Sequence, residues 1–529
     1  MGDSADSFSL SSASYPNKKW RMSNSDSVSR RAFIGGMGGA VITVPLATLA
    51  NPGPDRDSAE LLQLSAGEAV ARMSRGEITA ERYARVLLAR CESLRALNAF
   101  ITLEPSRVLE AARECDKHRL SEGTLGPLFG LPIPVKDSVN TRDYPTSAGT
   151  PALRNFQPVA DAPIVSSLRA NGAIVLGKTN LHELSYGWTS NNLAFGAVRN
   201  PYDSTRIPGG SSGGTAVAVA AHMAPLGIAE DTEGSIRVPA AMCGIAGFRP
   251  STGRYSTKGC VPITPLFDQV GPHARSVSDL ALFDSVAAND WRPLGPASLK
   301  GLRFGIVRNY WFTSLDEQVE HLTQQALQRL RQAGAELVET ELPGLARLIE
   351  LTTDAVQNHD VRLSLARYLK DYGAHLTFEQ VVHEASPDIR ALFRSDVLPG
   401  GSNFVSEDVY SAARDIHLPA LRRLYRDYFT RTGVAAVVFP ATMVPPPLIG
   451  EDVTVDIGER KVPFFTVVGR NIAPGSTAGL PGLVLPAGLT TTGLPVGIEF
   501  DGPAGSDRAL LAIGLSLERA LGAIPAPRI

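Results

Sequence analysis

The sequence predicts an α/β protein: a single large domain with a central mixed, mostly parallel sheet covered by helices on both faces. Short apolar runs of strand length recur along the chain. Helical patterns separate several of these runs, as they do where helices connect strands of one sheet. Because the runs are apolar throughout, the strands are expected to be buried on both faces, which requires helices on both sides of the sheet.

Two helices are predicted at the start of the folded domain. Ser65 and Glu68 have the spacing of a capping box, and Gly76 is placed to end the helix that they begin. Thr79 is then placed to begin the second helix.

Six apolar runs are predicted to be buried strands: 132–135, 173–176, 302–307, 434–439, 483–485 and 496–500. The run 302–307, an amphipathic helix around 319–330 and a short strand at 336–338 form a predicted β-α-β unit. Residues 340–430 have helical patterns without a strand pattern, and we expect a helical insertion there.

Composition excludes several classes of protein. The 529 residues carry a formal net charge of −2, with 43% hydrophobic and 20% charged residues. Such a chain buries a core rather than staying disordered. It has no excess of lysine and arginine from which to build a surface for nucleic acid or anionic membranes. Its four cysteines are too few for a disulfide framework and lack the CxxC spacing of zinc sites.

Residues 1–50 resemble a twin-arginine export signal. A serine-rich segment leads to Arg30 and Arg31, which precede an uncharged stretch diluted by glycines. That stretch is too interrupted for a stable transmembrane helix. We therefore expect export to the periplasm with no membrane attachment after cleavage, or a cytoplasmic protein if the signal is not used.

Three motif matches lack their required context. Residues 172–179 fit the phosphate-loop pattern, but a buried strand is predicted in its middle. His182 and Glu183 begin a HExxH motif, but Tyr186 replaces the second histidine. Residues 209–213 fit GxSxG, but no strand precedes them and no histidine follows His417.

A lysine and two serines carry the predicted chemistry. Lys136 ends a predicted strand, Ser211 lies in a Gly/Ser loop, and Ser235 follows Gly234. A serine hydroxyl becomes a strong nucleophile only when a base removes its proton. A lysine can be that base if burial lowers its pKa from about 10.4 toward neutrality. The backbone N–H groups of residues 232–235 could form an oxyanion hole.

These segments resemble the amidase signature family over about residues 60–525. The matching motifs are Leu131–Asp137, Gly177–Leu184, Phe195–Tyr202 and the stretch from Gly209 to Pro239. The resemblance implies a Ser–cis-Ser–Lys triad, with Ser235 as nucleophile, Ser211 as bridging serine and Lys136 as base. It also implies a cis bond between Gly210 and Ser211.

Further roles follow for the neighbouring residues. The expected oxyanion donors are Thr232, Glu233, Gly234 and Ser235, and the expected supporting residues are Gly210, Ser212, Asp231 and Arg237. Glu233 departs from the glycine of many family members. We expect its side chain to point away from the oxyanion or to meet a cation such as Arg237.

The resemblance implies an amide hydrolase that uses an acyl-enzyme and needs neither a metal nor an organic cofactor. Residues 485–508 resemble the arylacetamide branch, which includes indoleacetamide and mandelamide hydrolases. The expected partner is therefore a small amide with an aryl group, bound by a monomer or homodimer in a pocket shaped by residues 340–430. Carbamate, anilide or ester hydrolysis, and ammonia transfer by an amidotransferase subunit, remain alternatives.

Overall fold

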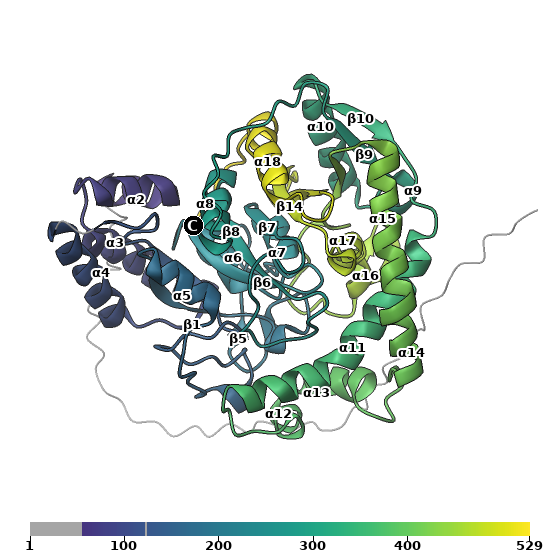
Figure 1. Cartoon of the computed structure of the whole chain (residues 1–529), viewed down its shortest axis with the longest axis horizontal. Helices are drawn as coiled ribbons and strands as arrows, with labels where there is room; N and C mark the ends of the chain where they lie inside the picture. Colours follow the sequence, from purple (N-terminus) through teal and green to yellow (C-terminus); the bar gives the residue numbers. More distant parts are fainter. Residues whose placement is uncertain (1–55, 122–123) are drawn as a thin grey trace, which may run out of the picture. The chain divides into compact units, whose positions relative to one another are not determined.

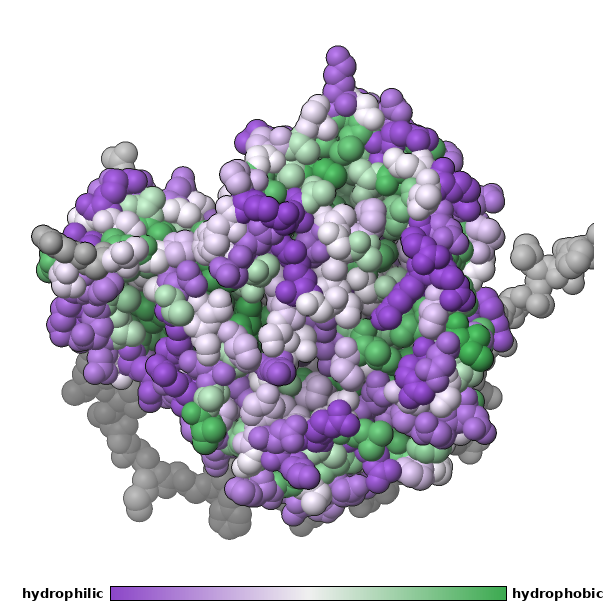
Figure 2. All heavy atoms as spheres, in the orientation of Figure 1, coloured by the Kyte–Doolittle hydropathy of each residue, from purple (hydrophilic) through white to green (hydrophobic). Residues whose placement is uncertain are grey.

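The computed structural model describes residues 56–121 and 124–529. The predicted export signal, residues 1–50, lies outside the described residues. In the described part of the chain, no helix combines the length and apolar character that a membrane span requires. Figure 2 shows hydrophilic side chains over much of one face, interrupted by hydrophobic areas, one of them near α14.

The described residues form one eleven-stranded sheet in the order β1-β3-β2-β6-β8-β7-β14-β15-β11-β9-β10 (Figure 1). Its strands are β1 Phe100–Thr102, β2 Pro132–Lys136, β3 Ile174–Thr179, β6 Leu226–Asp231, β7 Ala246–Arg249, β8 Gln269–Ala274, β9 Arg303–Ile306, β10 Glu336–Glu339, β11 Ala436–Pro440, β14 Gly482–Leu489 and β15 Pro495–Asp501. All six runs predicted to be strands lie in it. Two-stranded ribbons, β4 Asn191–Asn192 with β5 Gly196–Ala197 and β12 Thr454–Ile457 with β13 Arg460–Pro463, lie outside it.

The sheet is mixed, as predicted. Parallel pairing joins β3, β2 and β6 at one side and β11, β9 and β10 at the other. The strands between these two groups, and edge strand β1, pair antiparallel. The parallel share is therefore smaller than the apolar runs suggested. The reason is that the apolar runs 483–485 and 496–500 belong to antiparallel strands, so an apolar run does not by itself indicate parallel pairing.

Helices cover both faces of the sheet, as predicted. A Cβ on Gly514 of α18 (Asp507–Leu521) would lie 2.5 Å from Leu483, so α18 packs on the face to which Leu483 points. The next residue, Val484, points to the opposite face. There a Cβ on Gly497 would lie 3.2 Å from Val484 and 2.5 Å from Ala241 of α7 (Arg237–Cys243).

The predicted caps and the β-α-β unit are confirmed. Ser65 and Glu68 form the capping box of α2 (Ala66–Ser74), and Thr79 caps α3 (Ala80–Ser93). Helix α10 (Glu317–Gln332) connects the parallel strands β9 and β10. The other helices before residue 340 are α1 Arg56–Gln63, η1 Arg95–Leu97, α4 Pro105–Leu120, η2 Pro151–Leu153, α5 Pro163–Ala170, η3 Glu183–Ser185, α6 Gly213–Ala220, α8 Val277–Ala287 and α9 Arg308–Trp311.

Residues 340–430 are helical and contribute no strand. The segment comprises α11 Leu345–Asp371, α12 Phe378–Glu384, α13 Pro387–Leu392, η4 Phe393–Val397, α14 Glu407–Ala412, η5 Ala413–His417 and α15 Leu418–Thr432. Figure 1 shows these helices along one side of the sheet. Parts of α11, α12 and α13 share a buried apolar cluster with Leu184 and Val261. Helices α16 Phe464–Gly469 and α17 Ala473–Ala478 precede the β14–β15 hairpin.

Candidate active site

Lys136 lies at the carboxyl end of β2, beside the parallel strand β6. Val135 pairs with Ile228, so the last residues of both strands reach the same edge of the sheet. Functional groups in sheets of this kind gather at the carboxyl ends of parallel strands. The two serine segments follow at this edge, in the loop before α6 and in the turn after β6.

The Lys136 amine lies where the sequence analysis placed it. Its Nζ is 2.6 Å from Ser211 Oγ, and neither residue is exposed to solvent. Burial lowers the pKa of Lys136 below its ordinary value, and the carboxylate of Glu230 opposes that shift. Lys136 and Ser211 are therefore joined in a site closed to solvent.

The backbone around Ser211 is fixed by its neighbours. The Gly210–Ser211 peptide bond is cis, as the family resemblance implies. Ser211 O accepts hydrogen bonds from His182 N at 3.0 Å and from Ser190 Oγ at 3.2 Å. A Cβ on Gly210 would lie 2.9 Å from both Ser190 Oγ and the carbonyl carbon of Trp188, so the loop requires glycine here.

Ser235 lies in the turn between β6 and α7 and is 5% exposed. Gly234, just before it, has φ of 113°, which L side chains rarely adopt. Ser212 N donates to Ser235 O at 3.3 Å and so joins the two serine segments. Among the described residues, none is hydrogen-bonded to the Ser235 hydroxyl, so the predicted Ser211–Ser235 contact is not a hydrogen bond here.

The turn at residues 232–235 offers backbone N–H groups, but not all four that were expected. Gly234 N donates to Asp231 Oδ1 at 2.8 Å and is not available to an oxyanion while that bond holds. Within the described part of the chain, the N–H groups of Thr232, Glu233 and Ser235 have no hydrogen-bond partner. We therefore expect three N–H groups of this turn, rather than four, to be available to an oxyanion.

The carboxylate of Asp231 holds this turn through hydrogen bonds and ion pairs. Its carboxylate also accepts from Ile236 N at 3.1 Å, and it pairs with Arg237 at 3.1 Å and Arg249 at 2.9 Å. Burial would raise the pKa of Asp231, but the two guanidinium groups outweigh it and hold the pKa well below its usual range. Arg237 also contacts Glu499 and Ser476, which connects the turn to the C-terminal part of the chain.

Of the two alternatives expected for the Glu233 side chain, an ion pair with Arg237 is not formed in the described part of the chain. Arg237 is already held by Asp231 and Glu499, and it forms no ion pair with Glu233 within the described residues. The Glu233 carboxyl instead lies near Gln357 and Asp354 of α11. Burial, and then Asp354, raises its pKa well above the usual value. This upward shift of the pKa disfavours a negative charge on Glu233 beside the oxyanion.

Two side chains at this edge were not assigned roles from the sequence. Glu230 Oε1 lies 3.0 Å from Lys136 Nζ, and Ser185 Oγ donates to the same oxygen. The signal was the apolar run 225–229 immediately before Glu230. If this run had been predicted as a strand beside 132–135, Lys136 and Glu230 would have been expected at the same edge of the sheet.

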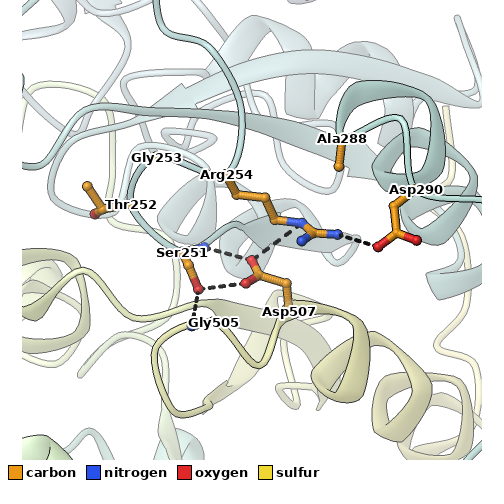
Figure 3. Close-up of a pocket in the computed structure, with 8 residues that line it drawn as sticks. All are labelled: Ser251, Thr252, Gly253, Arg254, Ala288, Asp290, Gly505 and Asp507. Atoms are coloured by element: carbon orange, nitrogen blue, oxygen red, sulfur yellow. Dashed lines mark hydrogen bonds and ion pairs between the residues drawn. The ribbon is translucent and has the colours of Figure 1, made fainter.

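A separate hollow of about 380 Å³ contains none of these residues (Figure 3). Arg254 is held there by Asp284 at 2.7 Å and Asp290 at 3.8 Å, and Ser251 donates to Asp507. Its charged groups are therefore already paired. Nowhere in the described ranges do three His, Cys, Asp or Glu side chains come together as metal ligands.

This fold and site define a class of serine hydrolases in which a buried lysine, rather than histidine, contacts the serine cluster. The sequence profile of the amidase family matches residues 82–511. The chain belongs to that family and is an amidase, a hydrolase of linear amide C–N bonds.

Relatives and solved structures agree with this assignment. The chain is 38% identical to indoleacetamide hydrolase of Agrobacterium vitis over 459 residues, which cover 86% of this chain and 97% of the relative. It is 36% identical to mandelamide hydrolase of Pseudomonas putida, with coverage of 88% and 93%. The peptide amidase of Stenotrophomonas maltophilia superposes with a TM-score of 0.71 at 29% identity, covering 88% of this chain and 98% of that chain.

Proposed function

We propose that this amidase hydrolyses small aryl-containing carboxamides through an acyl-enzyme on Ser235, releasing ammonia or an amine and a carboxylic acid. The observation that carries the proposal is the 2.6 Å contact between the buried Lys136 amine and Ser211 Oγ, beside the Ser235 turn.

In the first step, Ser235 Oγ forms a bond to the amide carbon. Its proton passes to Ser211, whose own proton passes to Lys136 Nζ. The N–H groups of Thr232, Glu233 and Ser235 receive the developing oxyanion. The proton then returns through the serines to the leaving nitrogen as the C–N bond breaks. Catalytic hydrogen bonds often tighten only when substrate binds, so we expect the Ser235–Ser211 contact to close then.

Water releases the acid by the same route. A water molecule gives its proton to the relay and bonds to the acyl carbon, and the Ser235 oxygen recovers a proton as it leaves. Apart from this water molecule, every group in these steps belongs to this chain or to the amide substrate.

Aromatic side chains near Ser235 favour an aryl substrate. Trp188 Nε1 donates to Glu233 O at 3.2 Å, two residues from the nucleophile. The Trp188 ring packs edge-on against Phe465, with centroids 5.4 Å apart, and Phe465 is 47% exposed. Such rings offer an aryl group an apolar contact surface. The indoleacetamide and mandelamide hydrolases among the relatives support the same class.

The test is ammonia release from indole-3-acetamide, mandelamide and aliphatic amides of similar size. Wild type should prefer the aryl amides, and a fluorophosphonate should label Ser235. Ser235→Ala should lower kcat at least about 10⁴-fold and abolish labelling, because the nucleophile is gone. Lys136→Ala should also slow turnover strongly. Hydrolysis that survives Ser235→Ala would contradict the mechanism, and a preference for aliphatic amides would contradict the substrate class.

We also propose that residues 1–50 direct export of the folded enzyme to the periplasm. The support is the Arg30-Arg31 pair before an uncharged, glycine-diluted stretch.

A further inference from the structure

A buried carboxylate contacts the Lys136 amine in addition to the Ser211 hydroxyl. Glu230 Oε1 is 3.0 Å from Lys136 Nζ, and the side chains are 5% and 0% exposed. Glu230 is held in place by two serines. Ser185 Oγ donates to its Oε1, and Ser212 Oγ donates to its backbone carbonyl at 3.0 Å.

Other charged groups around this pair have partners of their own. Lys178 on β3 pairs with Asp137 at 3.2 Å, and Asp231 pairs with Arg237 and Arg249. Within the described ranges, Glu230 is the carboxylate within ion-pair distance of Lys136.

Of the remaining titratable neighbours, His182, His273 and Cys260 are neutral at pH 7, whereas Asp268 is partly ionised there. Burial lowers the pKa of His182 and His273 to about 4 and raises that of Cys260 well above its usual value. Burial, together with Glu230, raises the pKa of Asp268 to about 7. Asp268 accepts from Thr232 Oγ1 at 2.7 Å.

The geometry constrains how a neutral lysine can act. A neutral amine has two N–H bonds and one lone pair. If one N–H donates to Glu230, the lone pair can face Ser211 and accept its proton. Once the proton arrives, the ammonium lies in a site without solvent, where an unpaired charge is costly. The Glu230 carboxylate is then its counter-ion.

We propose that Glu230 is a positioning residue that orients the Lys136 amine toward Ser211 and stabilises the ammonium formed during acylation. Glu230 exchanges no proton: the proton travels from Ser235 through Ser211 to Lys136 and back to the leaving nitrogen. The inference rests on the proposed acyl-enzyme function.

The sign of the pH effect follows from charge. Glu230 raises the pKa of Lys136 against the effect of burial, and removing its charge therefore lowers that pKa. The rate falls at low pH where Lys136 becomes protonated, so the acid limb of kcat/KM should move to lower pH. The plateau should also fall because the ammonium loses its counter-ion.

The experiment compares pH profiles of kcat/KM for indole-3-acetamide in the full chain and in Glu230→Gln. We expect the plateau to fall about 10-fold or more and the acid limb to move down by about one pH unit or more. Glu183→Gln removes another buried carboxyl, one that accepts from Ser386 N rather than contacting the lysine, and should leave the limb in place. Glu230→Asp should move the limb in the same direction by less.

The outcomes separate this inference from the function on which it rests. An unmoved limb in both Glu230 variants, with only a lower rate, would mean that Glu230 is merely structural. If Glu230→Gln does not fold, Glu230→Asp decides. For a variant with little turnover, the pH dependence of fluorophosphonate labelling replaces the rate. Activity retained in Ser235→Ala would refute the acyl-enzyme itself, whatever the Glu230 profiles show.

Discussion

Glu230 and Asp231 are adjacent on β6 but pair with different cations. Successive residues of a strand point to opposite faces. Glu230 meets Lys136, whereas Asp231 meets Arg237 and Arg249. One strand end thus supplies the counter-ion of the base and the anchor of the Ser235 turn.

Asp231→Asn should destabilise the protein by about 3–5 kcal/mol at pH 7, because it leaves two buried guanidinium groups without their shared counter-ion. Chemical denaturation measures this loss. The low pKa of Asp231 in the folded state means that its stabilisation is present above the unfolded value of about 3.9 and is lost as pH falls further. The difference between wild type and variant should therefore shrink below about pH 4.

Asp427→Asn is the matched control. Asp427 pairs with Arg426 at the surface, where both side chains are more than half exposed. The denaturation midpoint of the Asp427→Asn protein should equal that of wild type. An equally stable Asp231→Asn protein would mean that the turn is held by other contacts.

At the scale of elements, the site depends on how closely α6 packs against the loop after β3. A Cβ on Gly214 would lie 2.3 Å from Asn180 O and 2.4 Å from Ala99 O. These are backbone atoms, so they cannot rotate away as a flexible side chain could. Gly214 N also donates to Asn180 O at 3.0 Å. The helix that follows Ser211 is thus fixed by its second residue.

Gly214→Ala should destabilise the protein by about 1–3 kcal/mol or more, because the backbone must move to admit the methyl group. It should also lower kcat, since Ser211 precedes the displaced helix. Gly295→Ala is the control, because nothing lies within 4 Å of a Cβ there. Thermal melts and initial rates of the two variants test the expectation, and equal melting temperatures would contradict it.

Sequence patterns predicted much of this fold because their signals are local. Caps such as Ser65 and apolar runs such as 132–135 are set by neighbouring residues. Four strands of the sheet, β1, β6, β7 and β8, were not predicted. For example, β1 has only three residues, and β8 includes Gln269, Pro272 and His273. Their strand conformation depends on partners far away in the sequence.

The same limit applies to the site. Lys136, Ser211 and Ser235 could be predicted from their motifs. The partner of Glu233 could not, since it comes from α11, and neither could the contact of Glu230 with Lys136, because β6 was not identified as a neighbour of β2. The partners in these contacts are far apart in the sequence and meet only because of the order of strands and helices in the fold.

At the scale of the whole molecule, the export proposal can be tested directly. Replacing Arg30 and Arg31 with lysine should move the enzyme from the periplasmic to the cytoplasmic fraction, because the export machinery recognises the arginine pair of the signal. Activity in the two fractions measures the change. Arg21→Lys, outside the motif, should leave the distribution unchanged. Equal distribution of all three proteins would contradict the proposal.

The β14–β15 hairpin lies in the interior of the sheet order, although it is among the last elements of the chain. It brings Glu499 to Arg237 and separates β7 from β11. A ribosome must therefore synthesise nearly the entire polypeptide before the two halves of the sheet can join. A premature stop before residue 482 should yield an aggregated or degraded fragment rather than a folded enzyme of lower activity.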